Sequence, residues 1–143
     1  MIKICIYQNK IFKFAIILNR SGFDLSVLKS KKIEVYKTDG INFNGNKTSQ
    51  AESSGEANAT TTHYKNNQVN ITAFINTCYD GTQEIFSTVS NVISILGGHE
   101  YLGHYILKGD EKTAYNVQKN LPSWRNITHK LKKHINDELK KYY

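Results

Sequence analysis

The sequence predicts an α+β fold in which a small antiparallel sheet packs against one central helix, with further helices toward the C-terminus. Three observations predict it. Apolar residues alternate near the N-terminus and again over residues 69–75, which is typical of strands. They then recur every three or four positions from Ile85 to Ile106, which is typical of a helix. A second helical repeat runs from Leu131 to Tyr142.

The N-terminal segment, residues 1–41, is expected to consist of strands. Residues 2–18 alternate loosely between apolar and polar, with polar residues 8–10 between two halves, so we expect a hairpin of two short strands. Ser21-Gly22 would close this hairpin. A further strand is expected over residues 32–37, followed by a turn at Asp39-Gly40.

Residues 42–68 differ in composition from the rest of the chain. Asn, Ser, Thr, Gly, Ala and Glu dominate, and large apolar side chains are almost absent. Such a polar stretch of about 20 residues is too long for an ordinary compact loop. The composition therefore predicts a mobile loop or a linker between the N-terminal strands and a third segment, residues 69–143.

The third segment is expected to begin with a strand over residues 69–75 and a turn at Asp80-Gly81. The central helix follows, capped by Thr82 or Thr88. Gly97-Gly98 lies in its middle, where each glycine costs about 1 kcal/mol relative to alanine. Two glycines at this place indicate a close approach by another chain segment or a ligand.

Two more helices are expected near the C-terminus. Residues 111–120 form the first, which Leu121-Pro122 ends, and Thr128 caps the second, an amphipathic helix. The chain has a net charge of +7, and residues 108–143 contain nine basic and four acidic residues. We interpret these lysines as a solvated helix face. The alternative is a non-catalytic binding module for nucleic acid or an acidic partner, using Lys130, Lys132, Lys133, Lys140 and Lys141.

Length and composition exclude several classes of protein. A chain of 143 residues suits one domain, and its two cysteines, Cys5 and Cys78, give no disulfide framework and no Cys-type zinc site. The longest apolar run, residues 14–18, is far shorter than the ~20 residues of a membrane span. We expect no signal peptide, because polar residues interrupt the N-terminal apolar run. A cytoplasmic location and delivery within a longer secreted protein both remain open.

One motif carries the candidate chemistry. Residues 97–104 read Gly-Gly-His-Glu-Tyr-Leu-Gly-His, a variant of the His-Glu-x-x-His zinc-peptidase pattern with one extra residue. His99 and His104 are thus five positions apart, which an ideal α-helix would turn about 140° away from each other. A single-turn π-bulge would bring them together, and Gly103 would lower its steric cost.

The motif assigns a role to each residue. His99 and His104 would bind zinc (Zn²⁺), and Glu100 would act as general base on a zinc-bound water. Glu111, just beyond a turn at residues 108–110, is the first choice for the third metal ligand. The other candidates are Asp110, then His129 or His134, and last His63. Tyr115 is a candidate hydrogen-bond donor to a developing oxyanion, although a packing role is at least equally consistent with the sequence.

The motif also resembles known families. Residues 99–104 are similar to the His-Glu-Leu-Leu-Gly-His element of the dipeptidyl peptidase III family, in which both histidines and a distant glutamate bind zinc. Residues 69–143 resemble the C-terminal domains of bacterial polymorphic and Rhs-repeat proteins. The elements that carry this resemblance are residues 99–104, Gly109-Asp110, Lys112-Thr113-Ala114-Tyr115, Gln118, Pro122-Ser123-Trp124 and the Lys-rich final helix.

The second resemblance implies a zinc-peptidase-like toxin or effector domain over residues 69–143. It also implies a protein or peptide substrate and an immunity protein as partner. In one respect the chain departs from this pattern, since Glu111 and Lys112 stand where such domains carry histidines before the Lys-Ala-Tyr element. Glu111 would then replace a histidine ligand, or the site is impaired. A fold that binds zinc only structurally is a further alternative.

Overall fold

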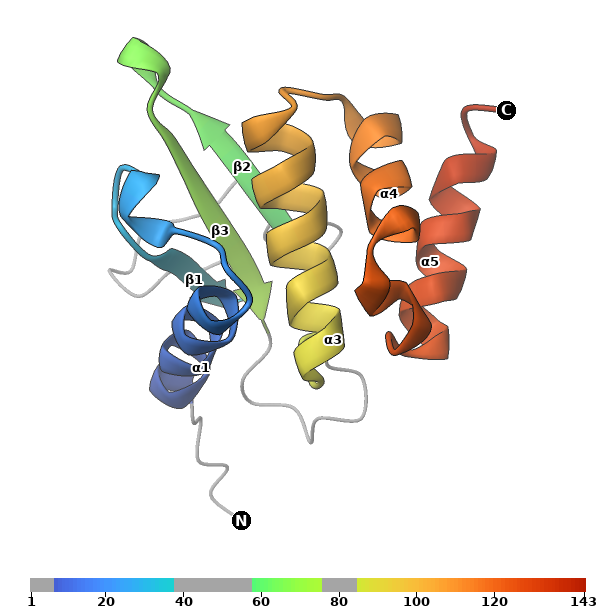
Figure 1. Ribbon diagram of the computed structural model, residues 1–143, viewed down its shortest axis with the longest axis horizontal. Helices are drawn as coiled ribbons and strands as arrows, with labels where there is room; N and C mark the ends of the chain where they lie inside the picture. The colour runs from blue at the N-terminus through green and yellow to red at the C-terminus, as the bar shows by residue number, and fades with distance from the viewer. Residues whose placement is uncertain (1–6, 38–57, 76–84) are drawn as a thin grey trace.

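The computed structural model describes residues 7–37, 58–75 and 85–143 (Figure 1). The elements in chain order are α1 (Tyr7–Arg20), η1 (Leu25–Val27), β1 (Ile33–Lys37), β2 (Ala59–His63), η2 (Lys65–Asn67), β3 (Val69–Ile75), α3 (Val89–Val92), η3 (Ile93–Ile106), α4 (Glu111–Asn120), η4 (Pro122–Arg125) and α5 (His129–Lys140). The fold is α+β, as expected.

The sheet has three strands in the order β1-β3-β2. β2 pairs antiparallel with β3, but β1 pairs parallel with β3, so the sheet is mixed and the expectation of an antiparallel sheet is wrong. Parallel neighbours need a long connection, and residues 38–68 between β1 and β3 supply it. The strands expected over residues 32–37 and 69–75 are confirmed as β1 and β3.

The N-terminal hairpin is not formed, because residues 7–20 are helical. Phe14 and Leu18 lie one helical turn apart, and both are buried in the core. The Phe14 ring packs on the ring of Phe86, with centroids 5.2 Å apart. A short apolar run with mixed spacing fits a strand and a buried helix equally, and here packing against the core favours the helix. Ser21-Gly22 does form a turn, at the end of this helix.

The polar stretch 42–68 contains β2, so the expectation of a mobile loop is wrong for residues 59–63. Threonines dominate this strand, and Thr61 lies opposite Ile71 in the neighbouring strand. The strand has almost no large apolar residue of its own, so the apolar pattern of the sequence does not predict it. Its backbone is held by pairing with β3, of which residues 69–74 are buried.

Helices and sheet form layers around the central helix. Figure 1 shows the continuous helix α3–η3 in the middle of the molecule, with the sheet on one side and α4 and α5 on the other. The core contains Leu96 of η3 and buried residues from the sheet and the flanking helices: Leu18, Ile33, Ile71, Leu131, Ile135 and Leu139. No helix in the described ranges is long and apolar enough to cross a membrane.

The expected helix boundaries in the C-terminal half are confirmed. Thr88 caps α3 and Thr128 caps α5, each accepting a hydrogen bond from a backbone amide three residues on. The buried Asn91 bonds to both Thr128 and the Ile85 carbonyl, which ties the start of α5 to α3. The turns at residues 39–40 and 80–81, Thr82 and both cysteines lie outside the described residues.

Candidate metal centre

The two motif histidines lie on a π-helix. Where the sequence predicts a single-turn bulge, η3 is a π-helix of 14 residues, Ile93–Ile106. In a π-helix each carbonyl accepts from the amide five residues on, so residues five apart lie on the same side. Ser94, His99 and His104 therefore form one row. The spacing that separates the histidines in an α-helix brings them together here.

A second row explains the glycines. Gly98 and Gly103 are also five residues apart, and both face the chain segment of α4 and its end. A Cβ on Gly103 would lie 2.7 Å from Cα of Ala114, and one on Gly98 would lie 2.5 Å from Cδ1 of Leu121. The close approach expected at Gly97-Gly98 is confirmed, since a Cβ on Gly97 would meet the Phe23 ring at 2.5 Å. Because neither glycine has a side chain, α4 lies close to η3, and side chains of α4 can contact the two histidines.

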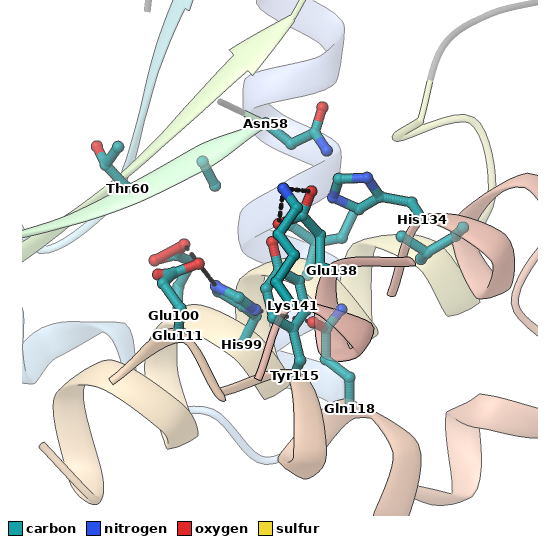
Figure 2. A pocket seen from close by; sticks show the side chains of 13 residues that line it. Asn58, Thr60, His99, Glu100, Glu111, Tyr115, Gln118, His134, Glu138 and Lys141 are labelled. Carbon is teal, nitrogen blue, oxygen red and sulfur yellow. Dashed lines mark hydrogen bonds and ion pairs between the residues drawn. The ribbon is translucent and has the colours of Figure 1, made fainter. Parts of the chain in front are cut away.

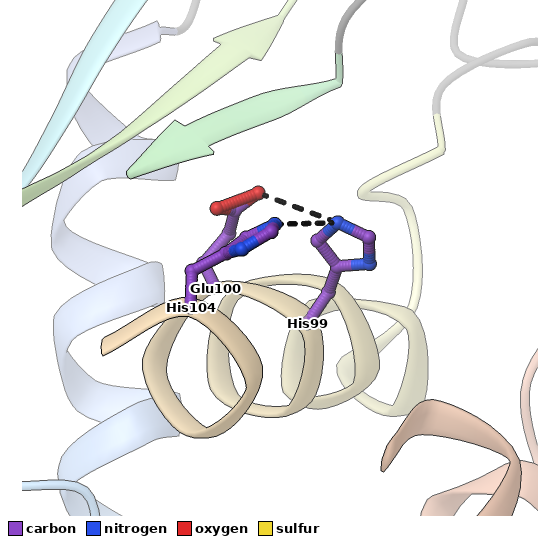
Figure 3. A group of neighbouring side chains, drawn as sticks. All are labelled: His99, Glu100 and His104. Atoms are coloured by element: carbon purple, nitrogen blue, oxygen red, sulfur yellow. Dashed lines mark hydrogen bonds and ion pairs between the residues drawn. The ribbon is translucent and has the colours of Figure 1, made fainter. Parts of the chain in front are cut away.

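The histidine side chains converge on one point. Nε2 of His99 lies 3.2 Å from Nε2 of His104 (Figure 3). Two zinc ligands at about 2.0–2.1 Å from the ion and at the tetrahedral angle are about 3.3 Å apart. The pair therefore has the separation that one shared metal ion requires.

Glu111, in the first turn of α4, adds its carboxylate to this point. Its Oε1 lies 2.7 Å from Nε2 of His104 and its Oε2 lies 3.3 Å from Nε2 of His99. The helix start is fixed by Asp110, whose side chain accepts a hydrogen bond from the Thr113 amide. Two imidazole nitrogens and one carboxylate group thus lie together, and one ion could bind all three groups.

The other ring nitrogens are held by acceptors behind the site. Nδ1 of His99 lies 2.8 Å from Oε1 of Gln118, and Nδ1 of His104 lies 2.9 Å from the Gly109 carbonyl. Gln118 is itself fixed, because its amide nitrogen donates to Oγ of Ser94. Donation from Nδ1–H leaves Nε2 as the nitrogen that can bind a metal. Such outer partners are typical of metal-ligating histidines.

Without a metal, Glu111 and His104 form a hydrogen-bonded ion pair. The Glu111 carboxylate raises the pKa of His104 to about 9, so Nε2 of this imidazole carries a proton at neutral pH. The hydrogen bond from His104 is the main reason that the pKa of Glu111 lies well below its usual value. A metal ion must displace the His104 proton in order to bind.

Glu100 is a second carboxylate beside the histidines. It is only 2% exposed, and its Oε1 lies 3.9 Å from Nε2 of His99. Thr61 of β2 donates a hydrogen bond of 2.6 Å to its Oε2. Burial raises the pKa of this carboxyl group. The ligand atoms of His99, Glu100 and His104 lie within 4.8 Å of one another, so this group could also hold a metal ion. Glu111 lies closer to both nitrogens than Glu100 does.

A cavity of about 620 Å³ opens beside these residues (Figure 2). Its volume falls in the range of about 300–1,000 Å³ that small-ligand sites have. Tyr115 of α4 lines it, and its ring packs edge-on against the His99 ring with centroids 4.5 Å apart. Burial is the main cause of the raised pKa of Tyr115. Its hydroxyl therefore remains a donor at physiological pH.

The structure brings together His99, Glu100, His104, Glu111 and Tyr115, and leaves other candidates outside. Asp110 caps α4, while His63 and His129 are exposed. His134 lines the cavity and its ring lies 6.0 Å from the Tyr115 ring, but among the described residues no hydrogen bond joins it to His99 or His104.

Gln118 and Thr61 were missed as contributors to the site. Gln118 has a detectable signal, because Glu111, Tyr115 and Gln118 follow the i, i+4, i+7 spacing of one helix face. Thr61 has none, because it lies in the polar stretch and 39 residues before its partner Glu100.

Comparison with known proteins identifies no related protein. No family model, no curated protein and no solved structure matches this chain. The fold and the site by themselves define an α+β domain with a candidate metal-binding centre on a π-helix.

Proposed function

We propose that this protein is a zinc-dependent hydrolase, most simply a peptidase that belongs to the metallopeptidase-like toxin or effector class. One observation carries the proposal. The two imidazole Nε2 atoms lie 3.2 Å apart, which fits one shared zinc ion, and the Glu111 carboxylate contacts both of them, while a second, buried carboxylate lies beside the group. This is the composition of a catalytic zinc site, with three protein ligands and one open position.

His99, His104 and Glu111 would hold the ion. Two imidazoles and one carboxylate suit zinc, and both imidazoles have the outer hydrogen-bond partners that orient ligands. When bound, zinc acts as a Lewis acid and lowers the pKa of a coordinated water to about 7. The remaining chemistry belongs to residues of the chain.

Glu100 is proposed as the general base. Its burial and raised pKa make the carboxylate a better proton acceptor at neutral pH than an exposed glutamate. The hydrogen bond from Thr61 holds Oε2, which leaves Oε1 on the side of His99. Oε1 is then the atom that takes a proton and later delivers it to a leaving amine.

Tyr115 is proposed to donate a hydrogen bond to the oxygen that gains negative charge. It lies in the cavity wall against His99, and its phenol keeps its proton at neutral pH because burial raises its pKa. A fixed donor of this kind stabilises a developing oxyanion. Its packing against His99 would also orient that ligand.

The biological setting rests on resemblance. The likeness of residues 69–143 to polymorphic and Rhs-repeat C-terminal domains favours a toxin or effector. Its substrate would be a protein or peptide, and an immunity protein would be its natural partner.

The alternative, a basic module for nucleic acid or an acidic partner, has weaker support. Lys133 and Lys140 pair with Asp137, and Lys141 pairs with Glu138. Lysines paired within their own helix fit a solvated face better than a surface kept free for phosphates.

The first test is metal content by mass spectrometry on the purified chain. We expect about one zinc per chain, lost in His99→Ala and in His104→Ala and kept in the control His129→Ala, which changes an exposed histidine. Glu100→Gln should keep the zinc and lower peptide hydrolysis by about 10²–10⁴-fold.

Three outcomes would contradict the proposal. A chain that takes up no metal after zinc is added and excess removed would exclude a zinc site. Hydrolysis that survives Glu100→Gln unchanged would exclude the assigned base. Bound zinc without hydrolysis of any peptide would indicate a structural zinc.

A further inference from the structure

The cavity extends away from the metal centre between β2 and α5. In Figure 2, His99, Glu100 and Glu111 lie on the left and His134 on the right, with Glu138 and Lys141 between them. His134, Glu138 and Lys141 are spaced i, i+4, i+7, so they form one stripe along α5 that faces the cavity. The β2 wall opposite them begins at Asn58.

Glu138 presents both carboxylate oxygens in one direction. Nζ of Lys141 lies 2.9 Å from Oε1 and 2.9 Å from Oε2, so a single cation is shared by the two oxygens. The Glu138 side chain is 26% exposed, while that of Lys141 is 66% exposed. Two carboxylate oxygens that face the same way can accept two parallel hydrogen bonds from one arginine guanidinium group.

The Glu138–Lys141 pair is easily exchanged. Lys141 follows the last residue of α5, and exposed ion pairs of this kind contribute little to stability. A cation arriving in the cavity can therefore replace the Lys141 ammonium at little cost. The charge of Glu138 would stay paired throughout.

The rest of the cavity lacks a competing cation. Among the described residues that line it, Lys141 is the sole lysine or arginine. His134 is half-buried, and this burial lowers its pKa, so its imidazole is neutral at physiological pH. At this end of the cavity a cationic ligand would therefore meet the Glu138 carboxylate, and the Lys141 ammonium is the one cation it would have to displace.

We propose that Glu138 is a specificity-determining residue that receives a cationic side chain of the ligand, arginine in preference to lysine, and that Lys141 occupies this position when the ligand is absent. Calling that ligand a peptide substrate rests on the proposed function. The subsite itself does not depend on hydrolysis.

Binding is tested first on the whole chain after metal removal. The probes are the N-acetylated, C-amidated pentapeptides Ala-Ala-Arg-Ala-Ala and Ala-Ala-Cit-Ala-Ala, where citrulline has the shape of arginine without its charge. We expect the arginine peptide to bind at least fivefold more tightly by calorimetry. Glu138→Gln should remove this difference, and Lys141→Ala should increase it. The matched control is Lys140→Ala, whose lysine pairs with Asp137 and does not line the cavity.

Cleavage is tested next on the zinc-loaded chain with a mixed peptide library read by mass spectrometry. We expect arginine or lysine at one fixed position from the cut bond. Glu138→Gln should lower kcat/KM at least tenfold for an arginine peptide and less than twofold for its norleucine counterpart, with zinc content unchanged. Glu138→Asp, which keeps the charge, should retain part of the preference.

The two proposals fail separately. Equal binding of the arginine and citrulline peptides, or an arginine preference that survives Glu138→Gln, would overturn the subsite. Cleavage without any preference for a basic residue would overturn it and leave the hydrolase intact. Selective binding without cleavage of any peptide would support the subsite and overturn the hydrolase.

Discussion

Gln118 and His99 are joined by a buried hydrogen bond of 2.8 Å between Oε1 of the amide and Nδ1 of the imidazole. Gln118 is 1% exposed and lies two turns after Glu111 on the same face of α4. One helix therefore supplies both a candidate metal ligand and the group that orients another ligand. If the site binds a metal, the packing of α4 against η3 would therefore affect its affinity.

Gln118→Leu should weaken zinc binding by about 10–100-fold, because His99 loses the acceptor that fixes its tautomer and ring orientation. Zinc affinity would be measured by competition with a coloured chelator. Gln118→Glu keeps an acceptor and should bind more tightly than Gln118→Leu. Asn120→Leu, at the exposed end of the same helix, is the control. Equal zinc affinity in the Gln118→Leu and wild-type proteins would show that this hydrogen bond does not tune the site.

Gly103→Ala should lower the free energy of unfolding by about 1–3 kcal/mol, as overpacking in a core does. Its Cβ would lie 2.7 Å from the Ala114 Cα, so Ala114→Gly, which removes only the Cβ, should not rescue it. Urea unfolding measures both variants.

Gly98→Ala provides the contrast. Its Cβ meets Leu121 Cδ1 at 2.5 Å, the end of a flexible side chain, so Leu121→Ala in the same chain should relieve the clash. A Gly103→Ala protein as stable as wild type would mean that η3 and α4 can separate without loss.

The His104–Glu111 pair makes the stability of the metal-free protein depend on pH. The pKa of His104 is raised from 6.5 to about 9, so its stabilising contribution is complete below pH 6.5 and lost as the pH rises to 9. The pKa of Glu111 is lowered, so its contribution is present above pH 4.5 and lost as the pH falls below that value. Urea unfolding in a chelator should therefore show falling stability between pH 6.5 and 9, with a flatter profile in His104→Gln.

Zinc binding should follow the opposite trend. At pH 7 the ion must displace the His104 proton, so binding should release about one proton and become tighter as the pH rises toward 9. Calorimetry in buffers of different ionisation enthalpy measures the released proton. An affinity that does not change from pH 6 to pH 8 would contradict the protonated state of His104.

The sequence predicts those features of the structure that depend on residues close together in the chain. The boundaries of α4 and α5 follow from local capping and periodicity, and Glu111 follows from the turn that precedes α4. The two motif histidines are five residues apart, which already requires a departure from the α-helix. That this departure extends over a π-helix of 14 residues could not be predicted from the spacing of the two histidines.

The missed features depend on contacts between distant segments. β2 has no apolar pattern of its own and is held by pairing with β3, and Thr61 reaches Glu100 across 39 residues of sequence. The N-terminal apolar run has two equally regular interpretations, and only packing of Phe14 and Leu18 into the core distinguishes them. Local patterns therefore predict the helix of the candidate metal centre and miss the strand that holds the Glu100 carboxylate.

Tyr115→Phe distinguishes a donor from a packing residue. The substitution keeps the ring that packs 4.5 Å from the His99 ring and removes only the hydroxyl. If that hydroxyl donates to the developing oxyanion, kcat should fall by about 10²–10³-fold while KM and zinc content change little. Tyr115→Leu is the companion variant, since it also removes the ring contact and should weaken zinc binding. An unchanged kcat in Tyr115→Phe, together with weaker zinc binding in Tyr115→Leu, would assign Tyr115 to orienting His99 alone.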